Sequence, residues 1–188
     1  MRANVTRAAE GFDRRSFTVD EILRMQDAGI VAEDENFELI EGEIVPKRAK
    51  THAHELFKTT LTIAIVRALP EHLWMGVEST LYLSPNTFVE PDLTVYPKGR
   101  KLEDVKGSDI LLAIEVAAMT LAYDRGLKAQ LYARYGVREL WVIDAARRAT
   151  FVHQGAEHGG WRSIVERGPD EALTHPVLPG FSVRLASA

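Results

Sequence analysis

Residues 90–132 decide the fold, and three pieces of this stretch carry its pattern: Glu90-Pro91-Asp92-Leu93, Ile110-Leu111-Leu112-Ala113-Ile114-Glu115-Val116 and Tyr123-Asp124-Arg125-Gly126-Leu127-Lys128. The middle piece is almost entirely apolar, which is typical of a central strand covered on both faces. Asp92 begins another strand-like piece, and Lys128 falls in a segment with helical spacing. The stretch therefore predicts an acid on each of two strands and a lysine on the following helix.

Glu115 is the residue that packing alone explains least. A carboxylate inside an apolar strand is costly to bury unless it is paired or binds a metal, so it is either half of an ion pair or a functional group. Asp92 has a plain interpretation as turn chemistry after Pro91. Lys128 also has a plain interpretation, as a solvated helix side chain paired with Asp124, four residues earlier.

Two carboxylates and a lysine are groups that suit metal-dependent cleavage of a phosphodiester. Mg²⁺ takes one or two protein carboxylates and keeps several waters, and such a cation lowers the pKa of a bound water. We expect Asp92 and Glu115 to hold Mg²⁺, or Mn²⁺ in its place, with the backbone carbonyl of Val116 as a third protein oxygen. Lys128 would position the attacking water or stabilise the charged transition state.

The rest of the chain alternates helices and strands. Residues 1–16 show no periodicity and are expected to be a flexible lead-in to a single domain over residues 17–188. Thr18 and Glu21 have the spacing of a capping box, which predicts a helix to about residue 28. The other expected elements are a hairpin over 37–45, helices over 52–69 and 124–135, strands over 77–83, 92–96, 109–116 and 140–144, and a returning strand over 150–154. This order predicts an α/β fold, a mixed β-sheet flanked by helices.

Composition narrows the class of protein. The 188 residues are 46% hydrophobic and 27% charged, with a formal net charge of -4 and no cysteine. The charge argues against a dedicated nucleic-acid binder but not against an enzyme that touches DNA locally. Without cysteine the chain has no disulfides and no thiolate metal site. It shows no signal peptide and no apolar run that could cross a bilayer, so we expect a cytoplasmic protein without membrane contact.

Several polar groups lie outside the central stretch. Glu38 falls in the predicted hairpin, and His54 falls at the start of the predicted long helix, where it is either a cap, a surface residue or part of a site. Three clusters of basic residues either lie in solvated loops or contact the phosphate backbone of a nucleic acid. The clusters are Lys47/Arg48/Lys50, Lys98/Arg100/Lys101 and Arg147/Arg148.

Taken in order, these motifs resemble the Uma2 family (DUF820) of proposed endonucleases, a branch of the PD-(D/E)XK nuclease superfamily. The resemblance covers nearly the whole chain after Phe17. Besides the three pieces above it includes Phe37-Glu38-Leu39-Ile40-Glu41-Gly42-Glu43-Ile44, His54, Leu131-Tyr132-Ala133-Arg134, Gly136-Val137, Leu140-Trp141-Val142-Ile143-Asp144 and Leu178-Pro179-Gly180-Phe181.

The resemblance implies a restriction-endonuclease-like core that cuts DNA by metal-activated water, in a bacterial protein that forms a homodimer. It implies that Asp92 and Glu115 bind Mg²⁺. It also implies that the family's lysine has moved from the strand, where Ala117 now stands, to Lys128 on the helix. Glu38 and His54 match recurrent family positions that edge the site, and Asp124 and Tyr132 belong to the motif around Lys128.

One segment departs from the family pattern. Related sequences usually carry an acid or hydroxyl-bearing stretch such as Ala-Asp-Ser-Ser after the Glu-Val pair, whereas this chain has Ala117-Ala118-Met119-Thr120. The departure favours an alternative from a different class, a nuclease fold that no longer cleaves and serves as a binding module. A hydrolase of small phosphate esters is a third hypothesis.

Overall fold

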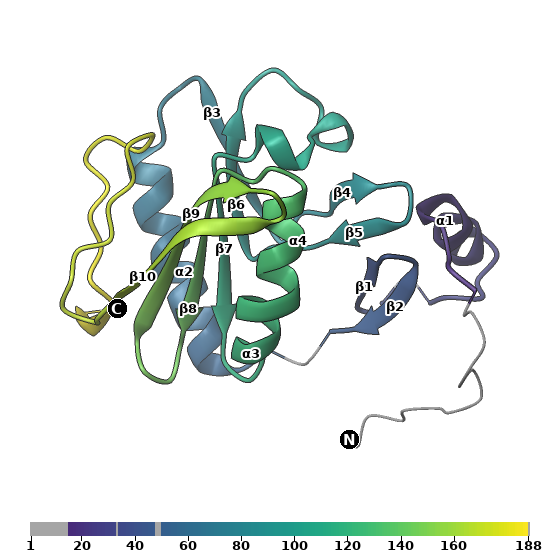
Figure 1. Ribbon diagram of the computed structural model, residues 1–188, viewed down its shortest axis with the longest axis horizontal. Coiled ribbons are helices and arrows are strands. Elements are labelled where there is room, and N and C mark those ends of the chain that lie inside the picture. The colour runs from purple at the N-terminus through teal and green to yellow at the C-terminus, as the bar shows by residue number, and fades with distance from the viewer. Residues whose placement is uncertain (1–14, 33, 48–49, 188) are drawn as a thin grey trace. The chain divides into compact units, whose positions relative to one another are not determined.

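The computed structural model describes residues 15–32, 34–47 and 50–187 (Figure 1). Most of the expected lead-in, residues 1–14, lies outside these ranges. The chain divides into two compact units, Met1–Lys47 with Ser84–Phe88 and Arg48–Leu83 with Val89–Ala188. The expectation of one domain over residues 17–188 stays a prediction.

Helix α1 (Val19–Asp27) in the first unit begins where the capping pattern predicts. The side chain of Thr18 accepts a hydrogen bond from the backbone N–H of Glu21, and the side chain of Glu21 accepts one from the backbone N–H of Thr18. Two backbone donors that the first helical turn leaves without helical partners are thereby satisfied.

Strands β1 (Phe37–Ile40) and β2 (Glu43–Pro46) form the predicted hairpin. Its two turn residues, Glu41 and Gly42, both have positive φ, 51° and 84°, as a tight two-residue hairpin turn requires. The smaller sheet has the order β2-β1-β5-β4, with β4 at Leu81–Ser84 and β5 at Thr87–Val89.

A six-stranded sheet is the centre of the second unit, in the order β10-β9-β8-β7-β6-β3. Its strands are β3 (Leu73–Val77), β6 (Leu93–Pro97), β7 (Leu112–Ala117), β8 (Glu139–Asp144), β9 (Ala149–Glu157) and β10 (Gly160–Arg167). The β7–β8 pair is parallel and the other neighbours are antiparallel. The predicted mixed α/β fold is therefore confirmed.

Helices cover both faces of this sheet (Figure 1). Helix α2 (His52–Ala68) packs Phe57, Leu61 and Ile65 against one face. The other face meets a helical segment built from α3 (Leu121–Tyr123), a π-helical turn (Asp124–Lys128) and α4 (Ala129–Arg134). Short 3₁₀ turns at Leu102–Asp104, Gly107–Asp109 and Leu185–Ser187 complete the described elements.

Side chains of β7 alternate between these two helical layers. Leu112, Ile114 and Val116 belong to the core cluster formed with α2. Because successive strand residues point to opposite faces, Ala113, Glu115 and Ala117 point toward the second helical layer. All six residues of β7 are buried, which explains why the strand has a continuous apolar sequence with a single carboxylate.

Two sequence predictions differ from the structure. The strand expected over residues 77–83 is two strands, because the chain turns at Glu78, where φ is +48°. The helix expected over residues 124–135 begins at Leu121 and contains the π turn, in which the backbone N–H of Ala129 reaches the carbonyl of Asp124. A single-turn π-helix of this kind is frequent at functional sites.

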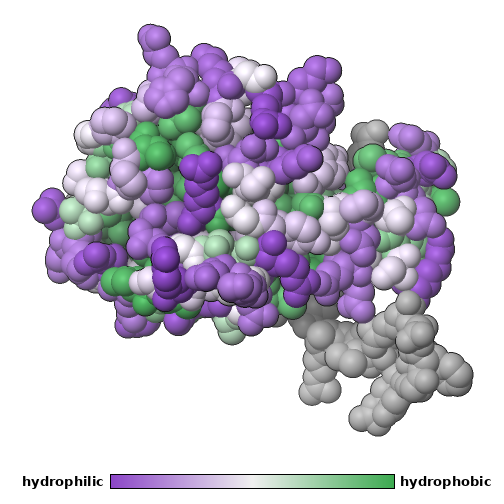
Figure 2. All heavy atoms as spheres, turned by 45° about the horizontal axis from the view of Figure 1, so that its top comes forward, coloured by the Kyte–Doolittle hydropathy of each residue, from purple (hydrophilic) through white to green (hydrophobic). Residues whose placement is uncertain are grey.

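No helix within residues 15–32, 34–47 and 50–187 is long and apolar enough to cross a membrane. The face shown in Figure 2 is covered mostly by hydrophilic residues, with apolar ones scattered among them.

Candidate active site

Asp92 and Glu115 lie at the same end of two neighbouring strands. The β6–β7 register pairs Leu93 with Ile114, so Asp92 and Glu115 each lie one residue beyond this pair. Asp92 is 7% exposed and Glu115 is 5% exposed. The structure therefore brings together two buried carboxylates that are 23 positions apart in the sequence, since 115 − 92 = 23.

Two side chains of the second helical layer contact the carboxylate of Glu115. The Nζ atom of Lys128 lies 2.7 Å from Oε1 of Glu115, and the hydroxyl of Tyr132 donates to the same oxygen at 2.5 Å. Lys128 is 4% exposed, so the interpretation of Lys128 as a solvated helix side chain is wrong. The ammonium compensates the buried charge that the sequence singled out.

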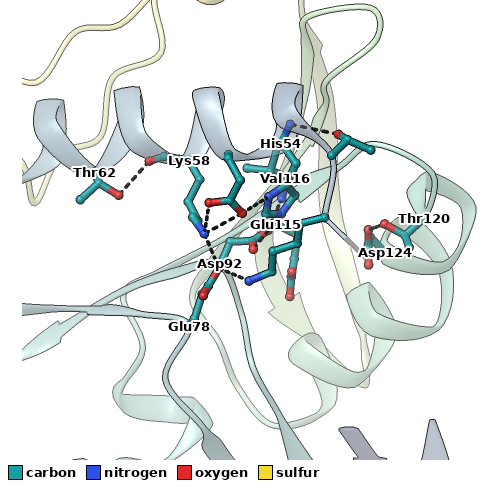
Figure 3. Close-up of polar contacts among 12 residues, drawn as sticks. His54, Lys58, Thr62, Glu78, Asp92, Glu115, Val116, Thr120 and Asp124 are labelled. Atoms are coloured by element: carbon teal, nitrogen blue, oxygen red, sulfur yellow. Dashed lines mark hydrogen bonds and ion pairs between the residues drawn. The ribbon is translucent and has the colours of Figure 1, made fainter. Parts of the chain in front are cut away.

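Asp92 is held from two sides. Its Oδ2 atom accepts a hydrogen bond from the backbone N–H of Val116 at 2.7 Å, and its Oδ1 atom lies 2.9 Å from Nε2 of His54 (Figure 3). Burial disfavours the charged form of His54, but hydrogen bonds and charges of Asp92 and Glu55 outweigh it and raise the pKa of His54 above its ordinary value. His54 is 7% exposed, so its interpretation as a surface residue is wrong.

The remaining expected site residues lie farther out or in the other unit. Asp124 is buried and accepts a hydrogen bond from the hydroxyl of Thr120 at 2.5 Å. This bond ties the loop after β7 to the π turn that carries Lys128. Glu38 is buried on β1 in the first unit, and its place at the edge of the site stays a prediction.

The structure adds a charged cluster that the sequence analysis did not identify. Lys58 lies on α2 one helical turn after His54 and is 9% exposed. Its Nζ atom contacts Glu55 at 2.8 Å and also contacts Oε1 of Glu78. Lys50 contacts the same oxygen of Glu78. Burial raises the pKa of Glu78, but hydrogen bonds and charges of the two lysines prevail and lower it to about 2.

The spacing of His54 and Lys58 was the available signal for this cluster. Residues four apart lie on one face of a helix, and α2 also buries Phe57 and Leu61. A basic residue in such a buried row needs a partner. The pattern did not show which residues of distant segments would supply that partner.

The donor set fits a hard divalent cation. Asp92 and Glu115 offer carboxylate oxygens, which Mg²⁺ prefers, and one or two protein carboxylates suffice for it because it retains several waters. His54 holds Asp92 in the way that residues around a metal commonly orient its ligands. In the part of the chain that the structure describes, no group of three or more His, Cys, Asp or Glu side chains is arranged to hold a metal ion.

Comparison with solved structures identifies the class of fold. The chain is similar to the crystal structure of a "putative nuclease belonging to DUF820" from Anabaena variabilis ATCC 29413, with a TM-score of 0.69 and 17% sequence identity. The match covers 90% of this chain and 96% of the other. The protein therefore has the fold of this nuclease-like structure.

Residues 19–186 match the model of the Uma2 family, which is described as "Putative restriction endonuclease". The protein belongs to the Uma2 family. Among curated proteins no sequence matches significantly. The family membership confirms the resemblance that the ordered motifs indicated.

Replacing Lys128 with methionine should destabilise the protein strongly. The change removes an ammonium and leaves the carboxylate of Glu115 buried without it, which costs about 3–5 kcal/mol of unfolding free energy. Lys101→Met is the matched control, because Lys101 and Glu103 form an exposed pair at 3.4 Å, worth about 0–1 kcal/mol. Urea unfolding measures both variants, and equal losses would contradict a buried pair at Lys128.

Stability contributed by Glu78 should depend on pH. Its folded pKa of about 2 lies below the ordinary value of 4.5, so the contribution is present above pH 4.5 and is lost as pH falls toward 2. With its side chain 32% exposed, solvent screening reduces the contribution to about 1–2 kcal/mol at pH 6.

The measurement is the difference in unfolding free energy between the wild type and Glu78→Gln across this pH range. We expect more than half of the difference to disappear by pH 3. Glu166→Gln removes a carboxylate from the exposed pair with Arg147 and serves as the control. A difference that stays constant with pH would show that the carboxylate charge of Glu78 is not what stabilises the fold.

Proposed function

We propose that this protein is a Mg²⁺-dependent DNA endonuclease in which Asp92 and Glu115 hold the metal and Lys128 assists at the reacting phosphate. The observation that carries the proposal is that two buried carboxylates, Asp92 directly before β6 and Glu115 on β7, lie opposite each other in the strand register, and that Glu115 contacts the buried lysine Lys128 of the neighbouring helical layer. Family membership and fold support a nuclease activity. The expected homodimer and cytoplasmic location stay predictions.

The residues divide the chemistry between them. A bound divalent cation would lower the pKa of a water and neutralise charge that develops on phosphate oxygens. Asp92 and Glu115 supply the negative charge that attracts this cation, and their burial strengthens that attraction. The backbone carbonyl of Val116 is the proposed third oxygen ligand.

Lys128 contributes a fixed positive charge. Its ammonium, now 2.7 Å from Glu115, can hold the attacking water or stabilise the negative charge on phosphorus-bound oxygens in the transition state. Tyr132 donates to Glu115 and His54 contacts Asp92, so each carboxylate is oriented by a neighbour. We propose that Tyr132 and His54 position the two carboxylates and take no direct part in the chemistry.

The loop that departs from the family pattern does not remove this machinery. Ala117 is 1% exposed within β7, on the same strand face as Glu115. The amine that related sequences carry at that strand position comes here from Lys128, which already reaches Glu115. This placement favours cleavage over the alternative of an inactive binding module.

Calorimetric titration with Mn²⁺ and Mg²⁺, followed by cleavage of supercoiled and linear DNA, tests the proposal. We expect the wild type to bind the metal and to cut DNA only in its presence. Asp92→Asn with Glu115→Gln should abolish both, because an amide is a weaker and uncharged ligand. Lys128→Met, assayed at a temperature at which circular dichroism shows that it is folded, should retain metal binding and lose cleavage by about a hundredfold or more.

Glu139→Gln is the matched control, since Glu139 is a buried carboxylate on β8 that binds Trp141 and Gln154. It should leave both metal binding and cleavage intact. Metal binding or cleavage that survives in the Asp92→Asn/Glu115→Gln variant would contradict the assignment. A wild type that binds metal but cuts neither DNA nor RNA nor small phosphate esters would favour the binding module.

A further inference from the structure

Glu78 holds two lysines with a single carboxylate oxygen. The Nζ atoms of Lys50 and Lys58 both contact Oε1 of Glu78. The side chains are partly accessible, at 26% for Lys50, 11% for Lys58 and 32% for Glu78. Two ammonium groups that point at one oxygen form a site in which another oxyanion of similar size can replace the carboxylate.

Two members of this trio, Lys58 and Glu78, lie beside Asp92 of the candidate active site (Figure 3). The backbone N–H of Glu78 donates to the carbonyl of Asp92 at 3.1 Å. Lys58 follows His54 by one helical turn on α2, and His54 contacts Asp92. A ligand group bound by the two lysines would therefore be a close neighbour of a group bound at Asp92 and Glu115.

Glu78 adopts a backbone conformation that is unusual for its residue type. It directly follows β3 and has a φ of +48°, in the left-handed region that glycine or asparagine favours. Such conformations persist where surrounding contacts hold them and are frequent at functional sites. Here the contacts that hold Glu78 include the two lysines and the backbone bond to Asp92.

The overall charge of the chain makes this cluster important for binding a polyanion. A formal net charge of -4 means that binding to a polyanion must rest on local groups of basic residues. Near Asp92, the ammonium groups of Lys50 and Lys58 are such a group, yet Glu78 neutralises part of their charge. Glu55 contacts Lys58 separately, so Lys58 keeps its place when Glu78 moves away.

We propose that Lys50 and Lys58 form a binding site for a backbone phosphate of nucleic acid next to the scissile bond, and that the carboxylate of Glu78 occupies this site until nucleic acid displaces it. The position of this site next to a scissile bond rests on the proposed function, while the binding of a backbone phosphate does not. A carboxylate and a phosphodiester both accept hydrogen bonds from ammonium groups, so one can replace the other without a change in the lysines. Glu78 then lowers the affinity for nucleic acid and keeps the two lysines from attracting other anions.

DNA binding without cleavage tests this proposal. Fluorescence anisotropy of a labelled 20-base-pair duplex, in EDTA and at 50–200 mM KCl, measures affinity for the wild type and Glu78→Gln. We expect Glu78→Gln to bind about tenfold more tightly at 100 mM KCl, because both lysines become available to phosphate. Adding Lys50→Gln to this variant should remove the gain and reduce the slope of log affinity against log salt by about one.

Glu166→Gln is the matched control, because it removes the same charge from another glutamate that has a basic partner. Glu166 forms an exposed ion pair with Arg147. We expect its affinity for DNA to stay within about twofold of the wild type. Equal gains in Glu78→Gln and Glu166→Gln would overturn the proposal, since net charge alone would then explain them. Unchanged or undetectable DNA binding in Glu78→Gln would overturn it as well.

Titration with inorganic phosphate separates the two sources of a phosphate group. If Glu78→Gln binds inorganic phosphate but binds DNA no more tightly than the wild type, the site takes small phosphate compounds and the assignment to nucleic acid is wrong. The binding measurement contains no divalent metal. A protein that shows the expected affinity changes but never cleaves DNA would support this site while contradicting the proposed nuclease activity.

Discussion

Glu115 places a carboxylate on β7, a strand that is covered on both faces, and it shares its face of the strand with Ala113 and Ala117. Burying such a charge is favourable only if a positive charge and hydrogen bonds accompany it. Lys128 and Tyr132 supply both from the helical layer above the strand. Lys128 ends the π turn and Tyr132 lies on α4, so both partners of Glu115 come from one continuous helical segment. Charge compensation at Glu115 therefore ties the central strand of the sheet to this helical layer.

Charge compensation also governs the contacts on the side of the sheet that α2 covers. A continuous chain of contacts runs from Asp92 through His54, Glu55 and Lys58 to Glu78. Each carboxylate in it has at least one basic neighbour, so the region is electrostatically balanced without a ligand. Binding a cation or a phosphate must therefore exchange partners within this network. The affinity for either ligand is then the difference between the interactions gained with the ligand and those lost within the network. A single substitution can shift this difference in either direction.

Much of this arrangement was predictable from the sequence. The apolar pattern around Glu115 predicted a central strand with one carboxylate that needs a charged partner or a metal, and the ordered motifs predicted Asp92 and Lys128 beside it. The turn at Glu78 was not predictable, because the alternating pattern of apolar residues continues past it. The contacts that hold this turn come from Asp92 and two lysines, which lie in distant parts of the sequence. Lys58 was missed for a similar cause, since a lysine in an amphipathic helix is usually solvated. Local pattern identifies residues that need partners, whereas the fold alone decides which partners they receive.

The most direct measurement is an anomalous difference map from crystals of the wild-type protein soaked in Mn²⁺. The assignment predicts a peak in contact with the carboxylates of Asp92 and Glu115, with the ammonium of Lys128 still beside Glu115. A peak that vanishes in crystals of Asp92→Asn would confirm that this carboxylate is a ligand. A map at saturating Mn²⁺ without a peak at these two residues, or with its peak at other residues, would contradict the account.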